Sequence, residues 1–281
     1  MISKKKFKQY MFSTGRGLVL AFFLLLVLIP IYWTFITSLK TPQDINTLQI
    51  QYIPAHPSLE NYLSVLTTTD FLLYLKNSLF VSLVTSLIVL VISVLGGYGL
   101  ARYRYRGKRL TMLCFLLTQM VPFTLIAIPL YIIFNSIGLG DNLFGLALLY
   151  VALNVPFCVI TMQGFYANIP VAIEEAATMD GCTKPQMLLK IILPIMLPGI
   201  IAVFIFAFIG AWNDLLGAVM FINSNAKKTI PVGLSNYIGQ FSINWGEMCA
   251  GGMLALIPSA LLFAFAQKYV VAGMTTGAVK E

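Results

Sequence analysis

The sequence predicts an all-α integral membrane protein with six transmembrane helices. Of its 281 residues, 59% are hydrophobic and only 10% are charged, and the mean hydropathy is +0.87. Soluble domains carry about 25% charged residues, so this composition is far too apolar for one. Six long windows lack charged side chains, whereas a transmembrane barrel would show alternating segments of about ten residues.

Each window is long enough for the roughly 20 residues that a helix needs to cross the hydrocarbon core. The fifth helix is expected to continue past Asp214 to Phe221, and the first is too long for a signal-peptide core. We therefore expect an N-terminal segment (1–16), a membrane domain (17–272) and a C-terminal tail (273–281). The windows cover, in chain order, 17–39, 77–101, 110–140, 142–173, 191–213 and 248–267.

Lysine and arginine are distributed unevenly between the connections. Fourteen of the 18 lie in the N-terminal segment, the loops after the second and fourth helices, and the tail. Because positively charged loops remain in the cytoplasm, both termini and residues 170–194 are predicted to be cytoplasmic. The net charge of +8 then reflects topology, and no nucleic acid partner is expected. The four cations on the other side are Lys40, Lys76, Lys227 and Lys228.

The stretch 170–194 has start and stop signals of its own. Pro170 precedes VAIEEAAT, which is typical of a helix start with carboxylates near the positive end of the dipole. Gly181 is expected to end that helix in a left-handed conformation. Residues 183–186 then have the form of a capping box that begins a second helix. These signals alone leave two interpretations open, a projection that docks into another protein and a solvated interfacial helix.

A longer pattern resembles the EAA loop of permease subunits of ABC importers. That loop has E-A-A, three residues, G, nine residues, then I, any residue, L and P. Cys182 departs from the alanine usual in this loop. The matching residues are Glu175-Ala176-Ala177, Gly181 and Ile191-Ile192-Leu193-Pro194. Three further segments resemble the sugar-importing, maltose-type branch in particular: Trp212-Asn213-Asp214, residues 229–234 and residues 267–280.

The resemblance implies a permease that moves a sugar or oligosaccharide into the cell by alternating access. It implies a second permease subunit, which we expect to be a different chain, two separate ATPase subunits and an extracellular or periplasmic sugar-binding protein. No G-x-x-x-x-G-K-[ST] motif occurs in the sequence, so we expect no cofactor on this chain, with ATP and Mg²⁺ on the partner subunits. The expected location is a bacterial inner or plasma membrane, in contact with lipid.

The resemblance also assigns roles to residues. Coupling to an ATPase is assigned to Glu174, Glu175, Ala176, Ala177, Asp180 and Gly181. Contact between the tail and the ATPases is assigned to Gly273, Thr275, Gly277 and Lys280. An ionised Asp214 should avoid lipid, so it faces either a water-filled path or a neighbouring helix that it merely holds in place. The expected polar and aromatic lining of the sugar path is Gln119, Asn154, Trp212, Asn213 and Asp214.

Two other classes of function fit the residues less well. A secondary, ion-coupled transporter that works without ATPase partners would need inverted repeats or a relay of intramembrane ionisable groups. A membrane enzyme would need a nucleophile and base or a metal cluster. The single histidine, His56, lies in an outer loop without a second ligand, so no catalytic or metal site is expected.

Overall fold

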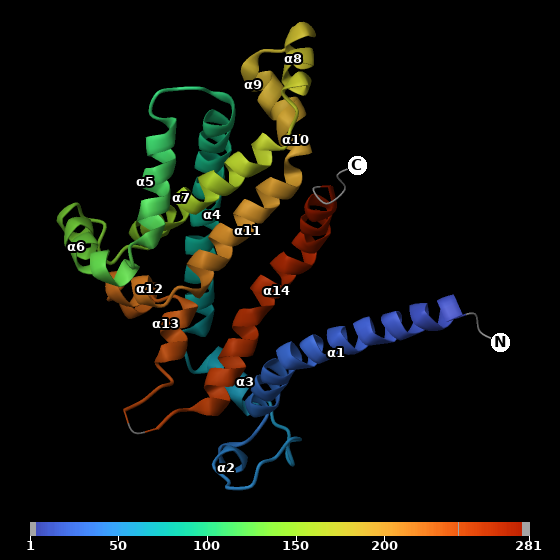
Figure 1. Ribbon diagram of the computed structural model, residues 1–281. Coiled ribbons are helices and arrows are strands. Elements are labelled where there is room, and N and C mark those ends of the chain that lie inside the picture. Colours follow the sequence, from blue (N-terminus) through green and yellow to red (C-terminus); the bar gives the residue numbers. More distant parts are fainter. Residues whose placement is uncertain (1–3, 241, 277–281) are drawn as a thin grey trace. The chain divides into compact units, whose positions relative to one another are not determined.

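The computed structural model describes residues 4–240 and 242–276, with side chains from 15 to 240 and from 242 to 268. Within these residues the regular structure is helical (Figure 1), apart from one isolated bridge between Ile238 and Ile243. The chain divides into two compact units. Unit 1 holds the residues up to 69 together with 236–254, and unit 2 holds 70–235 and the residues from 255 onward.

Unit 1 contains the first long helix and the start of the last. Its helices are α1 (Lys4–Ser38), α2 (Pro42–Ile45), α3 (Glu60–Thr67) and the first residues of α14 (Trp245–Thr276). The buried Asn61 side chain of α3 donates to the carbonyl oxygens of Ser38, at 2.9 Å, and Lys40, at 2.8 Å. Ser64 donates to Glu247 Oε1 at 2.8 Å. The short helix α3 therefore ties the end of α1 to the start of α14.

Unit 2 is built around three long helices, α4 (Phe71–Arg102), α7 (Leu143–Ala167) and α11 (Leu197–Asn213). Helices α4 and α7 approach closely because Gly97 has no side chain. A Cβ there would lie 2.8 Å from Met162 Cβ. Val89, Met162 and Val203 are buried together where the three helices meet. The packing of small against large residues thus gives this unit its core.

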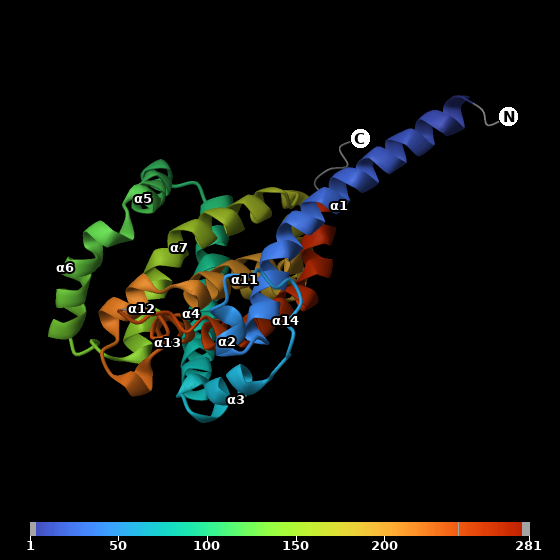
Figure 2. The same cartoon turned by 90° about the horizontal axis from the view of Figure 1, so that it is seen from below.

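Shorter helices surround this core. Helices α5 and α6 lie to one side of α7 (Figure 2). The shorter helices and turns of unit 2 are α5 (Lys108–Met120), α6 (Phe123–Ser136), α8 (Val171–Met179), α9 (Lys184–Met187), a π-helical turn η1 (Leu188–Ile192), α10 (Leu193–Ile195), α12 (Leu216–Phe221), a 3₁₀ turn η2 (Asn225–Lys227) and α13 (Ile230–Ser235).

Four helical segments of the described chain are long and apolar enough to cross a membrane singly. They are Gly15–Ser38, Phe71–Arg102, Leu143–Ala167 and Trp245–Lys268. Two bent pairs raise the number to six if each pair is one span. These are α5 with α6, bent by 100°, and Lys184–Ile195 with α11, bent by 81°. The all-α membrane class is confirmed, and the count of six spans stays a prediction.

Two of the expected membrane helices are interrupted. The window 110–140 is broken between Met120 and Phe123, because Pro122 cannot donate a backbone hydrogen bond and disfavours helical geometry at Val121, where ψ is 115°. The fifth helix bends at Met196, between α10 and α11. It also does not run on to Phe221 without interruption. Asp214 is extended, with ψ 125°, and helix resumes only at Leu216.

Two helix ends also differ from expectation, the end of α7 before the loop and the end of α14 in the tail. Helix α7 ends at Ala167, before the expected limit of 173, because Pro170 separates it from α8. The last helix continues through Gly273 and Thr275 to Thr276. The first four residues of the predicted tail are therefore helical. Gly277 and Lys280 lie outside the described residues.

Candidate functional site

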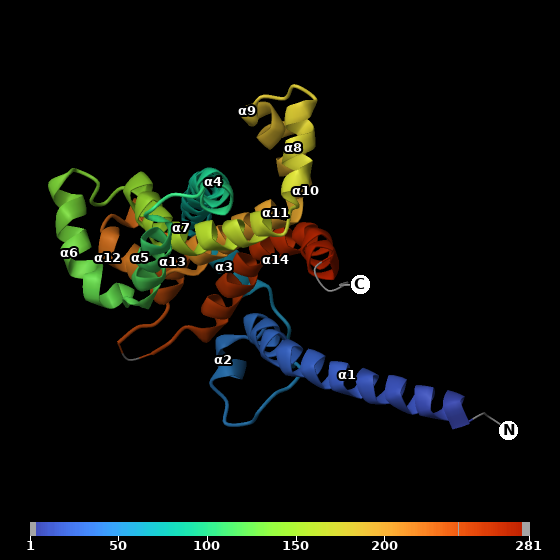
Figure 3. The same cartoon turned by 45° about the horizontal axis from the view of Figure 1, so that its top comes forward.

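The predicted loop forms two short helices joined by a sharp turn. Helix α8 ends at Met179, and Gly181, two residues further on, has a left-handed φ of +82°, as expected from its position. The N–H groups of Gly181 and Cys182 donate to carbonyl oxygens at the end of α8, each at 3.0 Å. The Thr183 N–H donates to Gln186 Oε1 at 3.0 Å as one half of the capping box that starts α9. Figure 3 shows α8 and α9 projecting away from α4, α7 and α11.

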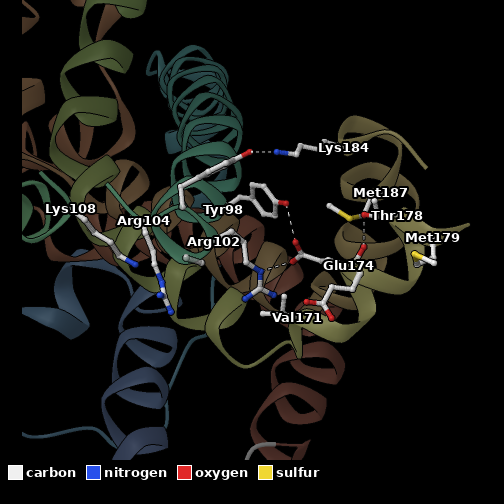
Figure 4. A pocket seen from close by; sticks show the side chains of 13 residues that line it. Tyr98, Arg102, Arg104, Lys108, Val171, Glu174, Thr178, Met179, Lys184 and Met187 are labelled. Carbon is white, nitrogen blue, oxygen red and sulfur yellow. Dashed lines mark hydrogen bonds and ion pairs between the residues drawn. The ribbon is translucent and has the colours of Figure 1, made fainter. Parts of the chain in front are cut away.

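The base of this projection is fixed by one carboxylate. Glu174, in the first turn of α8, accepts a hydrogen bond from Arg102 Nε at 2.5 Å and another from Tyr98 Oη at 3.0 Å (Figure 4). The Arg102 and Glu174 side chains are only 12% and 11% exposed. Arg102 also donates to the carbonyl oxygen of Ile169 at 2.8 Å. Glu174 therefore binds α4 of its own chain, and its expected role in coupling stays a prediction.

The opposite face of α8 is open. Glu175, Ala176, Met179 and Asp180 are exposed, and the Met179 side chain is 88% exposed. Ala177 is buried against the core. The six residues assigned to coupling thus divide into two that hold the helix down, Glu174 and Ala177, three that face outward, and the glycine of the turn.

A cavity of about 750 Å³ separates the projection from the end of α4 (Figure 4). Arg104 and Lys108 line one wall, and Glu175 and Lys184 line the other. Lys184 Nζ lies 3.4 Å from Tyr103 Oη and 5.2 Å from the centre of that ring. The cavity is open, and four cations and two carboxylates line it, so its lining carries a net positive charge.

The five residues predicted to line a sugar path do not form one cluster. Trp212 is buried and stacks on Phe208, with ring centroids 5.5 Å apart, while Asn213 is exposed. Asp214 accepts hydrogen bonds from Tyr150 Oη at 2.7 Å and from the Gly217 N–H at 2.8 Å. The Asp214 carboxylate therefore joins α7 to the break between α11 and α12.

The two remaining path residues contact the backbone of α7. The Asn154 side chain donates to the carbonyl oxygen of Tyr150 at 2.8 Å, and Gln119 of α5 donates to that of Leu153 at 3.4 Å. Asn154 also lies against Gly210 of α11, where an added Cβ would be 2.9 Å from Asn154 Oδ1. Polar side chains from α5 and α7 thus lie along one stretch of α7, against Gly210 of α11.

One lysine that opposes the charge bias is paired. Lys227 Nζ lies 3.0 Å from Asp141 Oδ2 and 2.5 Å from the Asp141 carbonyl oxygen. The Asp141 carboxylate also accepts from the Ser224 hydroxyl and from the N–H groups of Asn223 and Ser224. The hydrogen bonds from Ser224 in particular hold the pKa of Asp141 well below its usual range. The positive charge of Lys227 is therefore balanced locally, and the orientation of the chain stays a prediction.

The family is decided by a match along most of the chain. The model for "Binding-protein-dependent transport system inner membrane component" matches residues 90–276. The chain belongs to this family. The region that matches contains the loop, the Arg102–Glu174 pair, the second part of α4 from residue 90, and all of α7 and α11. The chain is thus an ABC importer permease.

Curated relatives and solved structures agree with this assignment. The permease is 35% identical over 252 residues to the "Diacetylchitobiose uptake system permease protein DasC" of Streptomyces coelicolor, which covers 89% of this chain and 91% of that one. It is 36% identical to the "Trehalose transport system permease protein SugB" of Mycobacterium tuberculosis, covering 90% and 92%. A chain of a bacterial ABC transporter "involved in the import of the acidic polysaccharide alginate" has the same fold, with a TM-score of 0.80, 23% identity, and coverage of 96% and 99%.

Sequence reasoning missed Arg102, Tyr98 and Tyr150. Arg102 was counted only as a topology charge, although a cation at the end of one predicted span and an acid at the start of a neighbouring cytoplasmic loop are plausible partners. Tyr98 lies in the glycine-rich stretch 96–99, which carries no signal for a bond to a loop carboxylate. For Tyr150 nothing in the local sequence signals its bond to Asp214, because the two residues are 64 positions apart.

Proposed function

We propose that this permease carries a sugar or oligosaccharide as one half of a permease pair. The curated relatives named above are permeases for diacetylchitobiose and trehalose, and a third, 33% identical, is the "Sulfoquinovosyl glycerol transport system permease protein SmoH" of Agrobacterium fabrum. These substrates are all glycosides, and this chemical class is what supports the proposal. The second permease, two ATPases that bind ATP and Mg²⁺, and a sugar-binding protein complete the assembly.

The observation that carries this function is the projection formed by α8 and α9. Its exposed face, with Glu175, Ala176, Met179 and Asp180, is the part that would seat in a cleft on an ATPase. The small Ala176 side chain permits close approach, and the two carboxylates suit a basic partner. A rigid projection is needed here, because a flexible loop would absorb a push from the ATPase without passing it on.

The Arg102–Glu174 pair gives the projection its connection to the membrane helices. Arg102 lies in the last turn of α4, and α4 packs against α7 and α11 in the core of unit 2. Movement of α8 would therefore pull on α4 through two charge-assisted hydrogen bonds to one carboxylate. In this proposal Arg102 and Tyr98 are positioning residues for coupling.

The sugar path remains a proposal with a smaller set of residues. Asn213 is exposed, and Asn154, Gln119 and Asp214 lie along α7, which is where hydroxyl partners for a sugar would be needed. Trp212 serves as packing in this chain because its ring is stacked on Phe208. The tail from Gly273, including Thr275, Gly277 and Lys280, is proposed to reach the ATPases.

Copurification tests this function. When the chain is purified by an affinity tag from its native membrane, one further permease and an ATPase should copurify with it. The number of ATPase chains should about equal the total number of permease chains. Deleting residues 171–187, which form α8 and α9, should release the ATPase while the second permease stays bound. Recovery of the chain without any ATPase would contradict the proposal.

Orientation is tested in the same preparation with Cys182, which lies in the turn and is partly exposed. A membrane-impermeant thiol reagent should label Cys182 in inverted vesicles and not in intact cells. Cys114 is also exposed and Cys249 is partly exposed, so labelling is measured in a Cys114→Ser, Cys249→Ser background. Labelling of Cys182 from outside would reverse the proposed topology.

A further inference from the structure

The connection between α4 and α5 carries a concentration of positive charge that coupling does not use. Arg104, Arg106, Lys108 and Arg109 lie within six consecutive positions, without a carboxylate among them. Within the described part of the chain, Arg106, Lys108 and Arg109 take part in no ion pair or side-chain hydrogen bond. Arg102, by contrast, is occupied by Glu174. Three neighbouring cations are therefore available for an anion.

These three cations form one end of an amphipathic pocket. A cavity of about 600 Å³ is lined by Arg106, Lys108 and Arg109 and, one to two turns further along α5, by Met112, Leu113 and Leu116. No carboxylate contributes to its lining. Leu113 and Leu116 are about half exposed. The pocket thus passes from charge to hydrocarbon along a single helix face.

A second cavity, of about 390 Å³, adjoins the first. Its walls come from α4, α5 and α7, and its lining is apolar apart from Thr111 and two tyrosines. Gly99 forms part of the wall, and a side chain added there would meet nothing within 4 Å. Tyr105 lines both cavities, so the basic pocket and the apolar slot meet at this side chain.

We propose that the α4–α5 connection is a binding site for an anionic phospholipid. The phosphate and acidic headgroup contact Arg106, Lys108 and Arg109, and the hydrocarbon chains lie along Met112 to Leu116 and in the slot beside Gly99. A free phosphate or nucleotide would use the cations and leave the slot empty. An acidic protein segment would place polar backbone against the slot, which has almost no hydrogen-bonding partners to offer it. Only an amphiphile with a negative head matches both parts.

The location fits this ligand. Arg102 ends α4 and Lys108 begins α5, so the cations lie at the level where a membrane helix gives way to a loop. Basic pockets between membrane helices at that level bind anionic headgroups in general. The site needs neither the sugar nor an ATPase, and therefore stands or falls separately from the proposed transport function.

Native mass spectrometry of the purified transporter, with its copurifying subunits, tests the site directly. The protein is exchanged into mixed micelles containing phosphatidylglycerol and phosphatidylcholine, and retained lipids are counted. The triple variant Arg106→Gln, Lys108→Gln, Arg109→Gln should lower phosphatidylglycerol retention about tenfold or more, because each cation near an anionic headgroup adds substantially to binding. Gly99→Leu fills the slot without changing any charge and should also lower retention.

Matched controls separate this site from the general positive charge of the chain. Lys4→Gln, Lys5→Gln, Lys6→Gln removes the same charge elsewhere, and Gly252→Leu adds the same side chain at another helical glycine with open space around it. Both should retain phosphatidylglycerol as the wild type does. The proposal is overturned if the lysine control loses as much lipid as the triple variant, if Gly99→Leu retains lipid normally, or if phosphatidylcholine binds equally well. Loss of an ATPase subunit with lipid retention unchanged would show that the pocket holds a protein partner instead.

Discussion

Arg102 Nε lies 2.5 Å from Glu174 Oε1, which joins the last turn of α4 to the first turn of α8 across 72 positions of sequence. The contact fixes the projecting helices to the core of unit 2. It also means that the first carboxylate of the loop acts within the chain, while Glu175 and Asp180 remain for a partner.

Breaking this pair should uncouple transport from ATP hydrolysis. Either Arg102→Glu or Glu174→Arg alone leaves two like charges in a mostly buried position, so sugar-stimulated ATPase activity should fall by roughly tenfold or more. The double exchange Arg102→Glu, Glu174→Arg restores opposite charges and should recover a large part of the stimulation. Basal ATPase activity, measured without sugar, serves as the control. No recovery in the double variant would mean that the pair is not the connection.

The turn at Gly181 makes a second prediction. A β-branched side chain disfavours the left-handed conformation, so Gly181→Val should tilt or unravel the junction of α8 and α9 by about 1–2 kcal/mol of strain. Uptake should fall while the chain still inserts into the membrane. Gly252→Val is the matched control, because Gly252 has no positive φ and nothing within 4 Å of its added Cβ. Normal uptake by Gly181→Val would speak against docking by this loop.

Asp214 and Asn213 should have separable effects. Removing the Tyr150 hydroxyl in Tyr150→Phe leaves the Asp214 carboxylate with one partner fewer, which should cost about 1–3 kcal/mol of stability. The half-saturation concentration for sugar uptake by the Tyr150→Phe variant should stay near that of the wild type. Asn213→Ala removes an exposed amide and should raise the half-saturation concentration with stability unchanged. If Asp214→Asn also raises the half-saturation concentration while the assembly stays intact, the Asp214 carboxylate contacts the sugar in addition to its bond with Tyr150.

The contact between Asp141 and the 223–227 segment should be insensitive to mild acid. Hydrogen bonds from Ser224 lower the pKa of Asp141, so the contact contributes stability above the unfolded pKa and loses it only as pH falls through the lower, folded value. Amide exchange at Asn223 and Ser224, corrected for the intrinsic rate, should be equally slow from about pH 5 to pH 8. Asp141→Asn should speed this exchange. A release of the segment near pH 5 in the wild type would contradict the assignment.

Local sequence rules predicted the parts of the fold that depend on neighbouring residues. The left-handed Gly181, the capping box that begins at Thr183 and the long apolar helices follow from backbone sterics, orphan N–H groups and the thickness of a bilayer. The bends at Val121 and Met196 did not follow, since a window without charges looks the same whether its helix is straight or broken. Pro122 is a local signal for the first bend, because proline disfavours helical geometry at the residue before it.

Long-range contacts were beyond these rules. The partner of Glu174 could not be found from α8 alone, because five basic residues lie between 102 and 109 and only the fold selects Arg102. Trp212 was expected to offer a face to sugar, but the helical spacing that places Phe208 one turn earlier stacks the two rings. Aromatic residues near a polar motif are thus a weak guide to which of them is accessible.

In the proposed function, this chain moves sugar only when separate ATPases drive its loop. The direct test is uptake of radiolabelled glycosides into proteoliposomes, first with diacetylchitobiose and trehalose. One set of proteoliposomes contains the chain alone, and the other contains the copurified assembly with its sugar-binding protein. The assembly should accumulate sugar when ATP is supplied on the side of α8, and the chain alone should accumulate none under a proton or sodium gradient. Accumulation by the chain alone, driven by an ion gradient, would show a secondary transporter and contradict the account.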